Sequence, residues 1–230
     1  MDTRLLEPNQ TRRNWSRTTS LLIAGAVAAF GEGDDEEEIS PAEDLMREHG
    51  VLKRVLLIYR EIIRRIDTRE DFPPDVVMSS AKLIRSFVED YHEKLEEDYL
   101  FPRFRKANRL VDLVETLKTQ HQRGRILTDR TMQAANASAV KDVSGRGALR
   151  ATLEQFVRMY EPHEAREDTV LFPGFRKIVS KHEYAALGEE FEKKENQLFH
   201  GDGFEKNVDA AAKLEKELGI YDLSKFTPAI

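Results

Sequence analysis

The chain has no cysteine among its 230 residues. It therefore forms no disulfide, and it has no thiolate that could bind a metal or act as a nucleophile. This absence excludes iron–sulfur clusters and most structural zinc modules, which are built on cysteine sulfur. Any metal site in this protein must use nitrogen and oxygen ligands.

An excess of positive charge is also missing, and so is a long apolar run. The formal net charge is −6. Because phosphate binding needs a basic face, we do not expect nucleic acid as a partner. The apolar run from Leu21 to Phe30 is too short for a stable transmembrane span. With 40% hydrophobic residues, the chain has enough apolar material for one sizeable core.

The N-terminal segment, residues 1–39, differs from the rest. Arg12-Arg13 and Trp15 precede the apolar run, which is the layout of an export signal, and the paired arginines resemble a twin-arginine signal. An acidic linker, GEGDDEEEI, fills residues 31–39. We expect this segment to direct the protein to the periplasm or otherwise out of the cytoplasm. The alternative is a tail on a cytoplasmic protein.

Residues 40–178 carry apolar side chains at helical spacing, and no strand pattern is present. Ser40-Pro41-Ala42-Glu43 forms a capping box that begins a helix running to about residue 67. A second helix should follow Pro73-Pro74 and end near Phe101-Pro102. Two more are expected over residues 108–136 and 148–171, with an irregularity at Pro162. Ser180 and Asp202 cap two further helices within residues 179–230. This pattern predicts an all-α fold, an antiparallel up-down four-helix bundle with a short helical C-terminal extension.

A fifteen-residue stretch occurs twice. Residues 92–106 read HEKLEEDYLFPRFRK, and residues 163–177 read HEAREDTVLFPGFRK. Each copy places a carboxylate four residues after an imidazole: Glu96 after His92 and Glu167 after His163. On an α-helix these positions lie one turn apart on one face, so each pair can approach the same metal ion.

Four of the six histidines fall one per long helix, with 43 residues from His49 to His92 and 42 from His121 to His163. The bundle therefore consists of two similar helical hairpins. Antiparallel packing would bring four imidazoles and two carboxylates to one level of the core. Buried charges are costly unless they are paired or metal-bound. Two carboxylates that bridge two cations resolve this cost, and imidazole with carboxylate suits iron, manganese or zinc.

This set of residues resembles the hemerythrin HHE cation-binding domain over about residues 40–178. The resemblance implies a non-heme centre of two iron ions that binds dioxygen or a related small ligand such as peroxide. Oxygen-carrying hemerythrins place a second histidine where this chain has Arg125, and their last carboxylate corresponds to Asp168. Glu93 instead matches a ligand of the iron-sensing hemerythrin-like domain of an F-box protein, and Glu164 occupies the same offset in the second copy. The candidate metal ligands are His49, His92, Glu93, Glu96, His121, His163 and Glu167.

The favoured function is the sensing or handling of oxygen, redox state or iron. Two alternatives stay open. The same centre could serve an enzyme such as a peroxidase or an oxidase, or the bundle could be a metal-free interaction module. A ferritin-like centre, which repeats Glu-x-x-His, is not supported, because Tyr160 precedes His163 at the place that Glu89 holds before His92. We expect Glu97 on a solvated face, and His182 and His200 on the surface.

Overall fold

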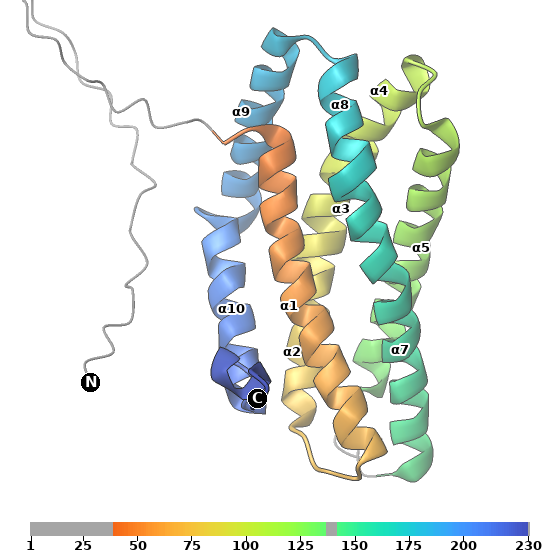
Figure 1. The fold of residues 1–230 in the computed structure, drawn as a ribbon, viewed down its shortest axis with the longest axis vertical. Coiled ribbons are helices and arrows are strands. Elements are labelled where there is room, and N and C mark those ends of the chain that lie inside the picture. The colour runs from red at the N-terminus through yellow and green to blue at the C-terminus, as the bar shows by residue number, and fades with distance from the viewer. Residues whose placement is uncertain (1–38, 137–141, 230) are drawn as a thin grey trace, which may run out of the picture. The chain divides into compact units, whose positions relative to one another are not determined.

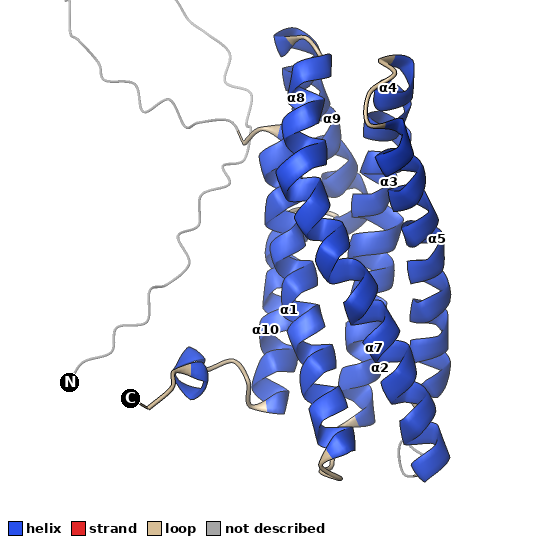
Figure 2. Cartoon of the chain, turned by 45° about the vertical axis from the view of Figure 1, so that its right-hand side comes forward, coloured by secondary structure: helices blue, strands red, loops and turns tan. Residues whose placement is uncertain are grey.

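The computed structural model describes residues 39–136 and 142–229, and every regular element within them is a helix (Figure 1, Figure 2). The expected all-α fold is confirmed. Four long rods form the bundle. The first rod is α1 (Pro41–Asp67), and the third is α5 (Val111–Ala134). The second rod consists of α2 (Pro74–Leu83), η1 (Ile84–His92), α3 (Glu93–Leu95), η2 (Glu96–Leu100) and α4 (Phe101–Lys106). The fourth consists of α7 (Val143–Arg166), η3 (Glu167–Leu171) and α8 (Phe172–Ile178).

The rods alternate in direction along the chain, as Figure 1 shows. α1 and α5 both pack against α7, and both also pack against the second rod. The predicted antiparallel up-down bundle of two hairpins is therefore the observed arrangement. Large aromatic side chains fill its interior, including Tyr59, Phe87, Phe156 and Tyr160.

The Ser40 cap is as expected, but the start of α7 differs from the prediction. The Ser40 side chain accepts from the Glu43 N–H at 3.4 Å, as the capping box predicts. α7 begins at Val143, earlier than the predicted residue 148, because Asp142 accepts from the Gly145 N–H at 3.1 Å and caps the helix there. α7 stays α-helical through Pro162, so the expected irregularity does not lie at that residue.

The second helix does not end at Phe101-Pro102, contrary to the prediction. In both copies of the repeat the helix widens into a π-helical turn, η2 or η3, and then continues. The N–H of Phe101 bonds to the carbonyl of Glu96, and the N–H of Phe172 to that of Glu167. A proline inside a helix clashes with the carbonyl four residues before it. The wider turn accommodates Pro102 and Pro173, and such turns are frequent at functional sites.

The C-terminal extension packs along the outside of the first hairpin. α9 (Lys181–Phe199) contacts α1, and α10 (Gly203–Leu218) contacts α1 and α2. Arg54 joins α1 to α10 through two hydrogen bonds to the Glu215 carboxylate, at 2.9 and 2.5 Å. A short 3₁₀ turn, η4 (Leu223–Phe226), follows.

Within the described ranges, no helix has the length and apolarity needed to cross a membrane. The expected export signal and linker, residues 1–39, lie outside the described residues except for Ile39.

Candidate metal centre

The four histidines predicted from the helices meet in the middle of the bundle as two pairs of rings. The His49 and His92 ring centroids are 4.7 Å apart, and those of His121 and His163 are 5.1 Å apart. All four side chains are buried. Each hairpin therefore contributes one pair of imidazoles, as the repeat requires.

The two carboxylates of the His-x-x-x-Glu motifs lie between these pairs. Glu167 Oε2 is 3.4 Å from His49 Nε2 and 3.1 Å from His163 Nε2. Glu96 Oε2 is 3.4 Å from His121 Nε2. Glu167 thus touches imidazoles from both hairpins, which is the position that a bridging carboxylate needs.

In each hairpin, the histidine on the second helix is His92 or His163. Its Nδ1 atom, called the outer nitrogen here, is hydrogen-bonded to a neighbour in the same hairpin. Glu48 Oε2 lies 2.7 Å from His92 Nδ1, and Gln120 Oε1 lies 2.8 Å from His163 Nδ1. The two partners are equivalent in the repeat, since each directly precedes the first histidine of its hairpin. An oxygen acceptor at Nδ1 fixes the proton there and leaves Nε2 free as a ligand.

The histidine on the first helix of each hairpin is His49 or His121. Its outer nitrogen, Nδ1, is hydrogen-bonded to a carboxylate of the opposite hairpin. Asp168 Oδ1 lies 2.7 Å from His49 Nδ1, and Glu97 Oε1 lies 3.1 Å from His121 Nδ1. The expectation that Glu97 faces solvent is therefore wrong, since its side chain is only 11% exposed. The repeat carried the signal: Glu97 and Asp168 each follow the carboxylate of a His-x-x-x-Glu motif.

The phenylalanine of each Leu-Phe-Pro segment packs against a histidine on the first helix of the opposite hairpin. The Phe172 ring stacks against His49 and the Phe101 ring against His121, each at 5.5 Å between centroids. The Leu-Phe-Pro segment therefore packs both of these imidazoles from the opposite hairpin.

Glu93, the seventh candidate ligand, has its own pair of donors. The Tyr160 hydroxyl donates to Glu93 Oε1 at 2.7 Å, and Arg125 Nη2 lies 2.7 Å from Oε2. One ligand atom each from Glu93, Glu97 and His121 falls within 4.8 Å of the others. Burial raises the pKa of Glu93 to about 8. Once ionised, its carboxylate has about four lone-pair directions, so these two donors leave room for a metal.

Glu164, at the offset equivalent to Glu93, is held more loosely. It is buried, and Lys53 Nζ lies 3.9 Å from Glu164 Oε1 and 3.8 Å from Asp168 Oδ2. Arg125 makes the tighter equivalent pairs, since its Nη2 also lies 2.8 Å from Glu97 Oε1.

Protonation of the imidazoles is governed by burial and by their neighbours. Burial lowers the pKa of His121 to about 4 and lowers the pKa of His92 well below its usual range. Burial acts in the same direction on His49, but the hydrogen bond to Asp168 and the nearby Glu167 carboxylate raise the pKa of His49 to about 9. Three of the four acceptors at Nδ1 are carboxyl groups, and burial and the nearby Glu195 charge raise the pKa of one of them, Glu48, to about 8.

The two central carboxylates differ in charge state. Burial and the nearby Glu167 charge raise the pKa of Glu96 well above its usual range. Burial also disfavours the Glu167 anion, but His163 and His49 outweigh it and lower the pKa of Glu167 well below the usual range. Of the two, only Glu167 is stabilised as an anion by neighbouring imidazoles.

The donor atoms aimed into the centre fit a metal pair. The buried Nε2 atoms of His92 and His121 and both carboxylate oxygens of Glu96 and Glu167 have no hydrogen-bond partner. Such buried polar atoms are costly unless another group satisfies them. Nitrogen and carboxylate donors with fixed outer partners are the chemistry that divalent and trivalent transition metals require.

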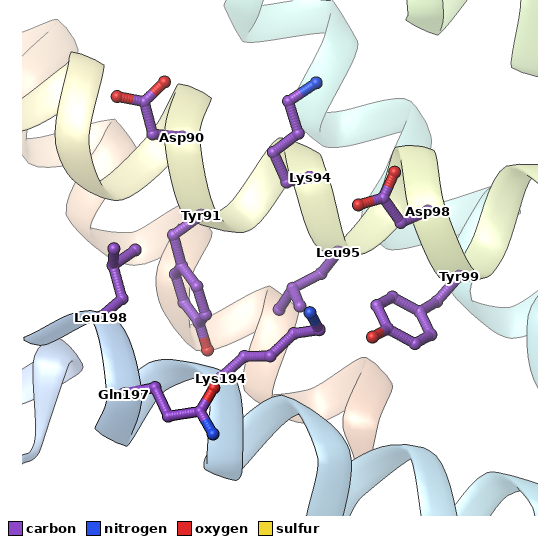
Figure 3. A pocket seen from close by; sticks show the side chains of 9 residues that line it. All are labelled: Asp90, Tyr91, Lys94, Leu95, Asp98, Tyr99, Lys194, Gln197 and Leu198. Atoms are coloured by element: carbon purple, nitrogen blue, oxygen red, sulfur yellow. The ribbon is translucent and has the colours of Figure 1, made fainter.

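A separate surface pocket of about 400 Å³ lies between the second rod and α9. Figure 3 shows Tyr91, Leu95 and Tyr99 turned toward Lys194 and Gln197 across it. No candidate metal ligand is among its lining residues.

The remaining histidines are exposed, as expected for His182 and His200. Of the tyrosines near the motifs, Tyr160 contacts a candidate ligand through its hydroxyl, whereas the Tyr99 hydroxyl donates to Glu190 on α9 at 3.2 Å.

A buried cluster of histidines and carboxylates in a four-helix bundle defines a helical metal-binding protein. Residues 40–139 and residues 112–219 both match the hemerythrin HHE cation-binding domain. The chain belongs to this family, which indicates that it binds a metal cation.

Relatives in mycobacteria share much of the sequence. The chain is 50% identical over 196 residues to an uncharacterized protein of Mycobacterium tuberculosis strain H37Rv, and the match covers 85% of this chain and 77% of the relative. Uncharacterized proteins of M. tuberculosis strain CDC 1551 and of Mycobacterium bovis match to the same extent. No solved structure matches the chain.

Proposed function

We propose that the protein holds two iron ions and uses them to bind dioxygen or a related small ligand, in oxygen, redox or iron sensing or handling. His49 and His92 would bind one ion, and His121, His163 and Glu93 the other. Glu96 and Glu167 would bridge the two.

The observation that carries this proposal is the arrangement of contacts around the two nitrogens of the imidazole rings. Every Nδ1 atom has an oxygen partner at 2.7 to 3.1 Å, and the Nε2 atoms of His49, His121 and His163 lie 3.1 to 3.4 Å from an oxygen of Glu96 or Glu167. A histidine that only stabilises the core does not need its second nitrogen directed at a buried carboxylate. Fixed outer partners are characteristic of metal ligands.

Iron is favoured by the donor set and by the family resemblance. Four imidazoles and three carboxylates without sulfur suit iron, and the same donors also suit manganese or zinc. When bound, an iron pair supplies reversible one-electron chemistry next to a small ligand. With Arg125 in place of a further imidazole, the carboxylate share is higher, which favours the ferric state. Sensing or handling therefore fits better than reversible oxygen carriage.

Metal analysis of protein from iron-fed cells tests the proposal. We expect about two irons per chain, as a two-metal site requires. His92→Ala and Glu167→Ala should each lower this value, whereas His182→Ala, at an exposed histidine outside the bundle, should not. Less than one iron per chain in the unaltered protein would reject the proposal.

A peroxidase or oxidase is the second candidate, favoured by the Tyr160 hydroxyl that donates to Glu93 beside the centre at 2.7 Å. Such a group can hold a proton for turnover. Steady peroxide consumption by the iron-loaded protein, abolished in His92→Ala and Glu167→Ala, would favour the enzyme. Stoichiometric reaction without turnover would favour the sensor.

We also propose that residues 1–39 direct export, supported by Arg12-Arg13 ahead of the apolar run. A twin-arginine route carries folded proteins, so the metal could be loaded before export. A fusion of these residues to a reporter should leave the cytoplasm, and a reporter that stays there would refute this part.

A further inference from the structure

The internal repeat extends beyond the candidate ligands to the residues that hold them. Glu48 and Gln120 are equivalent, and so are Asp168 and Glu97, which hold the two first-helix histidines. The repeat therefore gives each pair of imidazoles a matching set of two hydrogen-bond acceptors. We call each set a frame.

The frames differ in the acceptor at one pair of equivalent positions. A carboxyl oxygen of Glu48 lies 2.7 Å from His92 Nδ1, whereas the amide oxygen of Gln120 lies 2.8 Å from His163 Nδ1. The distances are nearly equal, so the difference lies in the kind of acceptor, a carboxyl group that can ionise in one frame and an amide that cannot in the other. An ionised acceptor makes a bond roughly twice as strong as a neutral one and draws the Nδ1 proton more strongly, which makes Nε2 a better donor.

Glu48 is well placed for this role. It is 2% exposed and lies on the same helix as His49, one residue before it. Gln120 is half-buried at the equivalent place before His121. Because the rings pair within hairpins, Glu48 acts on the His49–His92 pair and Gln120 on the His121–His163 pair.

We infer that Glu48 and Gln120 are positioning residues that make the two metal positions chemically unequal, each through the imidazole that it holds. Glu48 strengthens binding and favours the oxidised state of the metal at His49 and His92. Gln120 leaves the metal at His121 and His163 without that support. This inference rests on the proposed two-metal centre.

Anaerobic ferrous titration of the metal-free protein, followed by calorimetry, tests the inference with matched variants. Loss of an outer partner of a ligating histidine typically weakens metal binding about 10- to 100-fold. Glu48→Gln keeps the shape and an acceptor oxygen and removes only the ionisable group, so one of the two binding steps should weaken by about 10-fold, the lower end of that range, and by more than the other step. Gln120→Glu should instead strengthen the other step.

Glu89→Gln is the control. Glu89 is a fully buried glutamate on the same rod as His92, and its carboxylate accepts from Thr128 and pairs with Arg85, not with an imidazole. It should leave both binding steps unchanged. The melting temperature of each metal-free variant reports folding separately, and Gln120→Glu provides a gain that a folding defect cannot imitate.

The inference is overturned if Glu48→Gln leaves both steps unchanged or weakens both equally. The midpoint potentials provide a second readout, since Glu48→Gln should raise one potential and not the other. If the unaltered protein takes up fewer than two ions, the proposed function fails instead, and the two failures are distinguishable.

Discussion

Gly124 on α5 lies where the Tyr160 hydroxyl needs space. A Cβ atom added there would overlap the hydroxyl oxygen and lie 2.8 Å from Tyr160 Cζ and 3.0 Å from Cε2. Tyr160 is fully buried and donates to Glu93 at 2.7 Å, so its ring has little freedom to move away. Gly124→Ala should therefore displace Tyr160 from Glu93.

The size of the effect follows from three contributions. Alanine in a helix interior gains about 1 kcal/mol over glycine. Overpacking a dense core costs about 1 to 3 kcal/mol. Losing a hydrogen bond to a charged group costs about 1.5 to 3 kcal/mol more. The net destabilisation is about 3 kcal/mol, which for a chain of this size lowers the melting temperature by about 6 to 12 °C.

Urea denaturation of the metal-free protein measures this change against two comparisons. Gly50→Ala on α1 is the matched control, because nothing lies within 4 Å of its added Cβ, and it should stabilise the protein by about 0.5 to 1 kcal/mol. Tyr160→Phe removes the overlapping oxygen, so Gly124→Ala should cost at least about 1 kcal/mol less in that background. A Gly124→Ala protein as stable as the unaltered one, or strict additivity with Tyr160→Phe, would refute the reasoning.

Four further outcomes follow from the structure. Metal removal by a chelator should lower the melting temperature, because a ligand that binds only the folded state stabilises it, and an unchanged value would favour a metal-free module. Burial raises the pKa of Glu89 to about 7, so the fold holds its proton more tightly than the unfolded chain does. The metal-free protein should lose stability, on the order of 3 kcal/mol at most, between pH 4.5 and pH 7, and Glu89→Gln should flatten that part of a pH series of urea midpoints. Arg125→Met leaves the buried Glu93 without its cation, while Glu97 keeps Lys94, and should cost about 3 to 5 kcal/mol in urea denaturation of the metal-free protein, whereas Arg125→Lys should cost less. Asp202→Ala removes the cap on the Glu205 N–H at 2.9 Å and should cost about 1 kcal/mol, visible as a lower urea midpoint.

The sequence was most informative where it repeated itself. The helical spacing and the capping residue Ser40 predicted the bundle, and the paired His-x-x-x-Glu motifs predicted which imidazoles would meet. Both depend on local periodicity and on a rule of antiparallel packing, so no long-range information was needed.

Other features depended on tertiary structure. Proline normally ends a helix, and only the wider turn of η2 reveals why Pro102 is tolerated. Glu97 looked like a surface residue because its neighbours are charged, but the opposite hairpin supplies His121 as its partner. The partner of Glu48 is His92 on the next helix, not the adjacent His49, and spacing alone cannot distinguish these.

Iron positions in crystals of the iron-loaded protein test the central claim most directly. Anomalous scattering at the iron edge should give two peaks inside the bundle, one beside His49 and His92 and one beside His121 and His163, both next to Glu96 and Glu167. Metal–nitrogen distances should be about 2.0 to 2.2 Å, the usual range for imidazole bound to a first-row metal. A single peak, or iron found only on the surface while these six side chains hold none, would contradict the account.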